Sequence, residues 1–166
     1  MSLSKKFRFA TVGSILAGAA TVVAQTPPTS VAAAPAGPTP GERAIEYRQA
    51  VYRIVAGNFG PLSQVAQGKA EFNSESATKQ ATRLSQIATF VGDAYPDISK
   101  DGKTRALPAV WTNRKEFDQL VADFGTHTKS LADGVENSSS AGEELKAAVA
   151  AVGNDCKACH DKFRSK

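Results

Sequence analysis

The feature that most constrains this chain is the placement of its only two cysteines. Both lie near the C-terminus, in a segment from Cys156 to His160 that reads Cys-Lys-Ala-Cys-His. Two thiols three residues apart, followed directly by an imidazole, form the pattern for covalent attachment of haem c. The thiols can add to the two vinyl groups of the porphyrin, and the histidine can then reach the iron as an axial ligand. The pattern therefore predicts one covalently attached haem c, held by Cys156, Cys159 and His160.

Two other kinds of site use closely spaced cysteines. A structural zinc site needs four ligands, most often from cysteine and histidine, and His127 is the only other histidine or cysteine in the chain. Two cysteines in an exported protein usually suggest a disulfide. The adjacent histidine, and the absence of any further cysteine, favour haem over a zinc site and over a redox-active pair of thiols.

Residues 1–24 have the composition of a secretory signal peptide. Basic residues gather at positions 5–8, an uncharged apolar run fills residues 9–24, and small residues stand before the expected cleavage site. The apolar run has 16 residues, whereas a membrane-spanning helix needs about 20. We therefore expect a periplasmic protein, with an uncleaved membrane tether as the minor alternative.

Residues 25–41 hold five of the eight prolines in the chain. With the alanines and threonines around them they cannot build a core, so we expect a Pro/Ala-rich linker here and a folded domain over residues 42–166. Basic and acidic residues nearly balance in that domain, at 17 against 16. The sequence shows no concentrated basic patch, which argues against nucleic-acid binding, and no obvious charged surface for docking a redox partner.

Four stretches of the domain have the apolar spacing of amphipathic helices, at about residues 42–67, 74–94, 112–135 and 141–162. In the last stretch the apolar side chains step by three and four and include both thiols: Leu145, Val149, Val152, Cys156, Cys159 and Phe163. No stretch alternates with the period of two that a strand requires. The prediction is an all-α fold, an antiparallel four-helix bundle with a long connection over residues 96–110.

The second axial position of the iron is open to two interpretations. Most electron-transfer cytochromes of the c type use a methionine there, but the only methionine is Met1, which leaves with the signal peptide. His127 could supply the second ligand, which would give a low-spin, six-coordinate electron-transfer cytochrome. Otherwise the iron is five-coordinate, with an apolar or aromatic wall over its open side.

The domain resembles cytochrome c-prime, the class II c-type cytochromes, over about residues 42–166. The resemblance rests on the four helices, on Cys-Lys-Ala-Cys-His near the C-terminus, and on segments similar to those of the family: Tyr47-Arg48-Gln49, Asn58-Phe59-Gly60, Pro108-Ala109-Val110-Trp111, Val152-Gly153-Asn154-Asp155 and Asp161-Lys162-Phe163-Arg164. It implies that His160 is the only axial ligand and that the iron is high-spin. It also implies a homodimer, usually formed through the first two helices.

The resemblance also assigns three further residues to the haem site. Tyr52 matches the bulky residue over the distal face, Arg48 would lie near a haem propionate, and Arg164 would lie on the proximal side. Each has a plainer interpretation. Tyr52 can be a core aromatic, Arg48 a surface charge, and Arg164 part of a frayed, solvated terminus.

The expected function is binding of NO and CO at an open ferrous iron, together with single-electron exchange with periplasmic redox partners. Plain electron transfer is the second hypothesis. The distal polarity decides whether O2 also binds, and the Tyr52 hydroxyl could donate a hydrogen bond to it. Peroxidase-like catalysis is the third, and it needs a distal acid or base. Only Tyr52 or His127 could serve, so we do not expect an enzyme.

Overall fold

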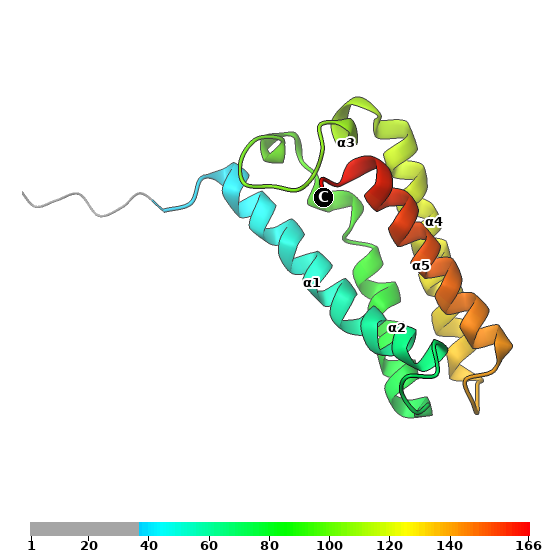
Figure 1. Cartoon of the computed structure of the whole chain (residues 1–166). Coiled ribbons are helices and arrows are strands. Elements are labelled where there is room, and N and C mark those ends of the chain that lie inside the picture. Colours follow the sequence, from blue (N-terminus) through cyan, green and yellow to red (C-terminus); the bar gives the residue numbers. More distant parts are fainter. Residues whose placement is uncertain (1–36) are drawn as a thin grey trace, which may run out of the picture. The chain divides into compact units, whose positions relative to one another are not determined.

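The computed structural model describes residues 37–166, so the expected signal peptide and all but the last residues of the expected linker lie outside the described residues. Four long helices make the fold (Figure 1): α1 (Pro40–Ala66), α2 (Ser74–Ala88), α4 (Arg114–Glu136) and α5 (Glu143–Phe163). Three short helical segments lie between α2 and α4: η1 (Gly92–Ala94), η2 (Asp97–Ser99) and α3 (Ala109–Thr112).

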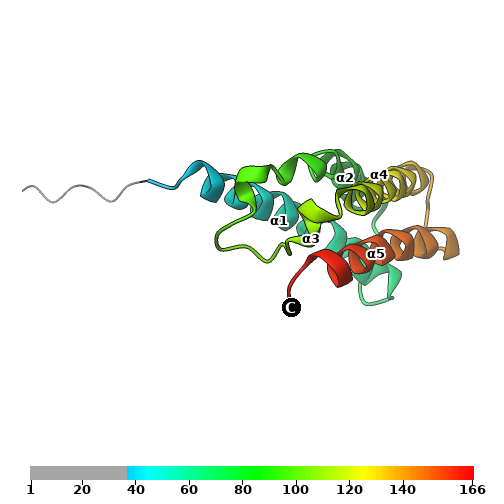
Figure 2. The same cartoon turned by 90° about the horizontal axis from the view of Figure 1, so that it is seen from above.

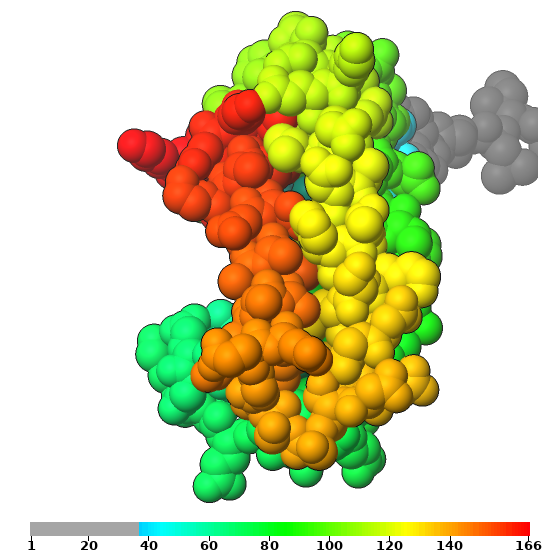
Figure 3. All heavy atoms as spheres, turned by 90° about the vertical axis from the view of Figure 1, so that its right-hand side faces the viewer, coloured from blue at the N-terminus to red at the C-terminus, as the bar shows by residue number. Residues whose placement is uncertain are grey.

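The long helices alternate in direction along the chain and pack as neighbours, α1 on α2, α2 on α4, α4 on α5 and α5 on α1 (Figures 1 and 2). Figure 3 shows α4 in yellow and α5 in orange to red side by side on one face. The predicted all-α, antiparallel four-helix bundle is confirmed. Within residues 37–166, no helix has the length and apolar character that crossing a membrane requires.

The first helix begins two residues earlier than the sequence predicted, inside the segment assigned to the linker. Thr39 is the N-cap and forms a capping box with Glu42: the Thr39 hydroxyl accepts from the Glu42 amide at 3.2 Å, and the Glu42 carboxylate accepts from the Thr39 amide at 2.7 Å. Pro40 then stands at the first helical position, where its missing N–H costs no hydrogen bond. The proline that suggested a linker therefore starts the helix.

The second helix ends at Ala88, whereas the apolar pattern predicted a helix to residue 94. After Ala88 the backbone amides bond the carbonyl three residues earlier, as in a 3-10 helix. These hydrogen bonds run from Thr89 to Gln86, from Phe90 to Ile87 and from Val91 to Ala88. Gly92 has low helix propensity, and Val91 still points inward and is buried. The apolar spacing therefore continued past the point where the α-helix had ended.

The core has two parts. The larger one fills the space between the long helices and includes Val55, Leu84, Leu131 and Val152. The smaller one closes the end of the bundle near α3 and is aromatic. There the Phe117 ring lies edge-on to Tyr95 at 4.7 Å and to Phe163 at 5.4 Å between ring centres. This second cluster ties the α2–α4 connection to the end of α5, which is where the functional residues lie.

Candidate haem site

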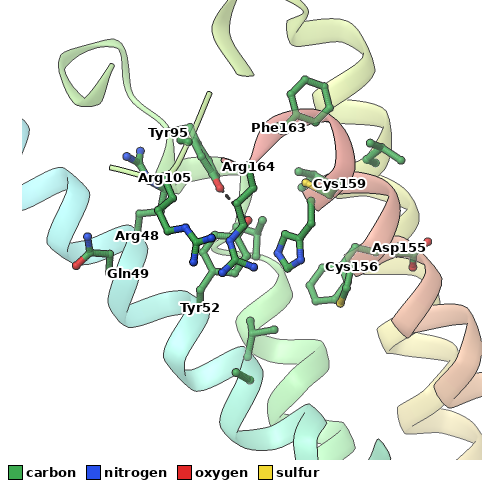
Figure 4. A pocket seen from close by; sticks show the side chains of 18 of the residues that line it. Arg48, Gln49, Tyr52, Tyr95, Arg105, Asp155, Cys156, Cys159, Phe163 and Arg164 are labelled. Carbon is green, nitrogen blue, oxygen red and sulfur yellow. Dashed lines mark hydrogen bonds between the residues drawn. The ribbon is translucent and has the colours of Figure 1, made fainter. Parts of the chain in front are cut away.

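A cavity of about 670 Å³ lies between α1, α4, α5 and the connection that follows α2. This is a size typical of pockets for cofactors and small molecules. Aromatic and aliphatic side chains make most of its wall: Tyr52, Val55, Phe59, Leu120, Val121 and Phe124. Figure 4 shows Cys156 and Cys159 on one side of this cavity and Arg48 and Arg105 across from them.

Cys156, Cys159 and His160 all line the cavity from the last turns of α5. Both cysteines are free and partly buried. Burial raises the pKa of the Cys159 thiol to about 11, and burial together with the nearby Asp155 carboxylate raises the pKa of Cys156. Redox-active Cys-x-x-Cys pairs instead have a lowered thiol pKa. The raised pKa of both thiols argues against a redox-active thiolate pair, and both thiols line the cavity.

The described part of the chain offers no set of ligands for a structural zinc ion. Across residues 37–166, no group of three or more histidine, cysteine, aspartate or glutamate side chains could hold a metal ion. The apolar cavity beside two thiols and an imidazole instead fits a haem: Cys156 and Cys159 would take its vinyl groups, and His160 would bind its iron.

The His160 imidazole is suited to bind iron in its neutral form. Burial lowers its pKa, and the positive charges of Arg164 and Arg105 lower it further, against the opposite effect of Asp161. A neutral imidazole has the free nitrogen lone pair that a metal needs. The surroundings of His160 therefore favour ligation at neutral pH.

Tyr52 lies on α1 across the cavity from α5 and does not act alone. Its hydroxyl shares a hydrogen bond of 3.0 Å with the hydroxyl of Tyr95, whose ring lies edge-on to it. Burial, followed by the neighbouring Tyr95, raises the pKa of Tyr52 far above its ordinary value. Both phenols therefore stay protonated. Sequence reasoning missed Tyr95, because its place depends on the irregular turn after α2.

Arg48 is buried, with 4% of its surface exposed, so the interpretation as a surface charge is wrong. Its Nη1 donates to the Ala94 carbonyl at 3.2 Å and to the Ser99 hydroxyl at 2.8 Å, and its Nη2 donates to the Thr104 hydroxyl at 2.7 Å. Its guanidinium also lies over the Tyr95 ring, 4.7 Å from the ring centre. Arg48 lines the cavity but also fixes the connection after α2. Its contact with a propionate stays a prediction.

The C-terminal segment is fastened to the same connection. The Leu107 amide donates to the Phe163 carbonyl at 2.9 Å, and the Ser165 amide donates to the Arg105 carbonyl at 2.8 Å. The Arg105 side chain also donates to the Ser165 carbonyl, at 2.8 Å from Nη2. Arg164 stands between these bonds and lines the cavity, with its side chain exposed. Its backbone is therefore held and not frayed, and Arg105 is a residue that the sequence gave no reason to select.

His127 lies on α4 outside the cavity wall. Its Nδ1 is 2.7 Å from an Asp155 carboxylate oxygen, and 43% of its side chain is exposed. Its imidazole is directed at Asp155 and lines no part of the cavity. The structure therefore does not support His127 as a second axial ligand.

Comparisons with known proteins agree with this site. The family model described as Cytochrome C' matches residues 43–164. Cytochrome c' of Rubrivivax gelatinosus is 35% identical over 130 residues, which cover 76% of this chain and 97% of that protein. Its crystal structure matches with a TM-score of 0.69 at 33% identity, over 76% of this chain and 97% of that one.

A nitric oxide complex is among the similar solved structures. It is that of a variant of cytochrome c prime from Alcaligenes xylosoxidans, with a TM-score of 0.69 and 27% identity, over 76% of this chain and 97% of that one.

Proposed function

This chain belongs to the cytochrome c' family, and on that premise we propose that it is a periplasmic haem protein with high-spin, five-coordinate iron. It binds NO and CO and carries single electrons. A covalently attached haem c is the cofactor of the family, and the two cysteines of this chain fit it. Cys156 and Cys159 form the two thioether bonds, and His160 is the axial ligand.

The observation that carries the proposal is that the cavity offers one axial ligand. Among residues 37–166, His160 is the only histidine that lines it, and no methionine does. The remaining candidate, Tyr52, is a poor ligand because its raised pKa keeps the phenol protonated. His160 would therefore hold the iron alone, and the residues of α1 and α4 would face its open position.

The side chains around that open position select the ligand. When bound, the haem supplies an iron that takes a diatomic ligand and a couple that exchanges one electron. Phe59 and Phe124 make the wall apolar, and the Tyr52 hydroxyl accepts a hydrogen bond from the Tyr95 hydroxyl. O2 needs a distal hydrogen-bond donor that NO does not, so this wall favours NO. The nitric oxide complex of the Alcaligenes relative supports the same choice.

The same residues argue against an enzymatic role. Acid–base catalysis needs a group with a pKa near the working pH within reach of the reacting atom. Tyr52 has a strongly raised pKa, and His127 lies outside the cavity wall. We therefore propose that the protein is a carrier and ligand-binding protein.

We also propose a homodimer through α1. Tyr47 and Ile54 are apolar or aromatic, lie seven residues apart on one side of that helix, and are 44% and 48% exposed. The Ile54→Arg variant should sediment as a monomer at micromolar concentration. The control Ile98→Arg, at a site that is 61% exposed and outside α1, should not change the sedimentation of the dimer.

The ligand selectivity is tested by titrating the ferrous holoprotein with NO, CO and O2. We expect saturation at one NO or CO per chain and no O2 adduct, and we expect the Tyr52→Phe variant to bind NO within about twofold of the wild type, because the hydroxyl makes no essential contact. A stable oxygenated form in the wild type, lost in Tyr52→Phe, would show instead that Tyr52 donates to the ligand.

A further inference from the structure

Four arginines line the cavity. Arg48 and Arg53 come from α1, Arg105 from the connection after α2, and Arg164 from the C-terminal segment. Three of them, Arg53, Arg105 and Arg164, are exposed, and we call these three the arginine mouth. Figure 4 places Arg48 and Arg105 across the cavity from Cys156 and Cys159. Segments far apart in the sequence therefore bring positive charge to one place.

The charge of the arginine mouth is not neutralised by the described part of the chain. None of its three members lies within 4.0 Å of a carboxylate of residues 37–166, whereas Arg114, Lys129 and other exposed cations do. The Arg105 side chain donates to the Ser165 carbonyl, which is neutral. Asp155 is the single carboxylate among the residues that line the cavity, and His127 is its partner.

Haem itself neutralises only part of this charge. Its two propionates lie on the porphyrin edge opposite the vinyl groups, so attachment at the cysteines would direct them away from Cys156 and Cys159. Two carboxylates set against the four guanidinium groups that line the cavity, Arg48 among them, leave a surplus of two positive charges there. The entire domain from residue 42 has an excess of only one basic residue. The surplus is therefore a local feature and not a reflection of overall charge.

We propose that the arginine mouth is the docking surface for an acidic, one-electron redox protein. The inference rests on the proposed function, because it gives the electron-carrying haem its route of exchange. A reduced partner with a carboxylate-rich surface docks at Arg53, Arg105 and Arg164, and one electron passes to the ferric iron while no bond forms or breaks. Complementary charge of this kind accelerates encounter and fixes orientation.

A protein surface fits the arginine mouth better than a small anion does. The three guanidinium groups belong to three separate segments and are exposed. A built anion site would instead have buried polar groups converging on one point. Exposed charges spread over a surface act mainly through long-range steering, which is strongest for a large partner with many opposite charges and weakens as salt screens it.

The test measures the reduction of the ferric holoprotein by a reduced plant-type ferredoxin, used as a strongly acidic one-electron donor, by stopped-flow. We expect the second-order rate constant to fall about tenfold or more between about 10 mM and 200 mM salt. In the triple variant Arg53→Gln, Arg105→Gln, Arg164→Gln, the rate at low salt should fall by about tenfold and lose most of its salt dependence.

The matched control removes the same charge elsewhere. Lys69, Lys79 and Arg83 are exposed and line no part of the cavity, so Lys69→Gln, Lys79→Gln, Arg83→Gln should leave the rate within about twofold of the wild type. Equal losses in the two triple variants would overturn the proposal, because net charge alone would then explain them. A rate with ferredoxin that is insensitive to salt would overturn it too.

Two further probes separate the remaining outcomes. A neutral flavin semiquinone should reduce the wild type and the mouth variant at rates that differ far less than the rates with ferredoxin do. The single variant Arg53→Gln, which keeps Arg164 at the haem site, should retain the ferrous and NO-bound spectra of the wild type. Loss of the reaction with ferricyanide but not with ferredoxin in the mouth variant would point to a small-anion site and contradict protein docking. If the rate with ferredoxin depends on salt and on the arginine mouth but the ferrous protein binds no NO, the proposed NO-binding function is wrong and the docking proposal stands.

Discussion

The two sides of the cavity are built in different ways. The attachment side is one helix, in which five consecutive residues of α5 supply both thiols and the imidazole. The opposite side is assembled from α1, the connection after α2 and the C-terminal segment, held together by Arg48 and by the bonds between residues 105–107 and 163–165. Chemistry on one helix depends on local spacing, whereas the arginine side depends on tertiary contacts.

The largest expected effect lies on the attachment side. The double variant Cys156→Ser, Cys159→Ser should lose all covalent haem, because neither hydroxyl adds to a vinyl group as a thiol does. Haem staining after denaturing electrophoresis measures this directly. Lys157→Ala is the control within the same motif, since Lys157 is exposed and pairs only with Asp161. Covalent haem in the double variant would disprove the attachment site.

Arg48 gives the largest expected effect on the arginine side. Arg48→Met should lower the free energy of unfolding by about 3 kcal/mol, because it leaves the buried acceptors at Ala94 and Ser99 without their donor. Urea denaturation of the holoprotein measures the loss. The control Arg53→Met, one turn further along α1 at an exposed site, should change it by less than about 0.5 kcal/mol. Equal losses would mean that Arg48 does not anchor the connection.

A smaller effect is expected from the pair of tyrosines. Tyr95→Phe removes the hydrogen bond to Tyr52 and should lower the free energy of unfolding by about 1 kcal/mol. Tyr52 accepts in this bond, so its loss releases no new donor and the variant should form no O2 adduct, as in the wild type. Tyr47→Phe, at an exposed tyrosine, should change neither quantity. Unchanged stability in Tyr95→Phe would show that the two hydroxyls interact with water instead.

The smallest effect is expected at His127. His127→Gln should leave the ferrous absorption spectrum unchanged, because the imidazole faces Asp155 and not the cavity. The free energy of unfolding should fall by about 1 kcal/mol or less, since the His127 side chain is partly exposed and its interaction with Asp155 is screened by water. A change in the spectrum would indicate that His127 binds the iron. The side of the cavity opposite α5 would then also supply an axial ligand, contrary to the comparison above.

The sequence allowed the prediction of the attachment side almost completely. Cys156, Cys159 and His160 lie within one helical turn or so, and a repeating apolar stripe through Leu145 and Val152 showed the helix that carries them. The other long helices followed from the same periodicity, because each buries one face against its neighbours. Such features depend on residues that are close in the chain.

The arginine side could be predicted only in part. The family resemblance selected Arg48 and Arg164, but the burial of Arg48 depends on the Ser99 and Thr104 hydroxyls, about fifty residues away. Arg53 and Arg105 carried no local signal, since an isolated arginine is usually a surface charge. The sequence showed no obvious charged patch for the same reason: these arginines come to line one cavity only after the chain has folded.

The central claim is that His160 is the only axial ligand, and the absorption spectrum of the purified ferrous holoprotein tests it most directly. Five-coordinate, high-spin iron predicts a broad Soret band without sharp alpha and beta bands, and a large shift when NO is added. Sharp alpha and beta bands before any ligand is added would show a second protein ligand on the iron. That result would contradict the account.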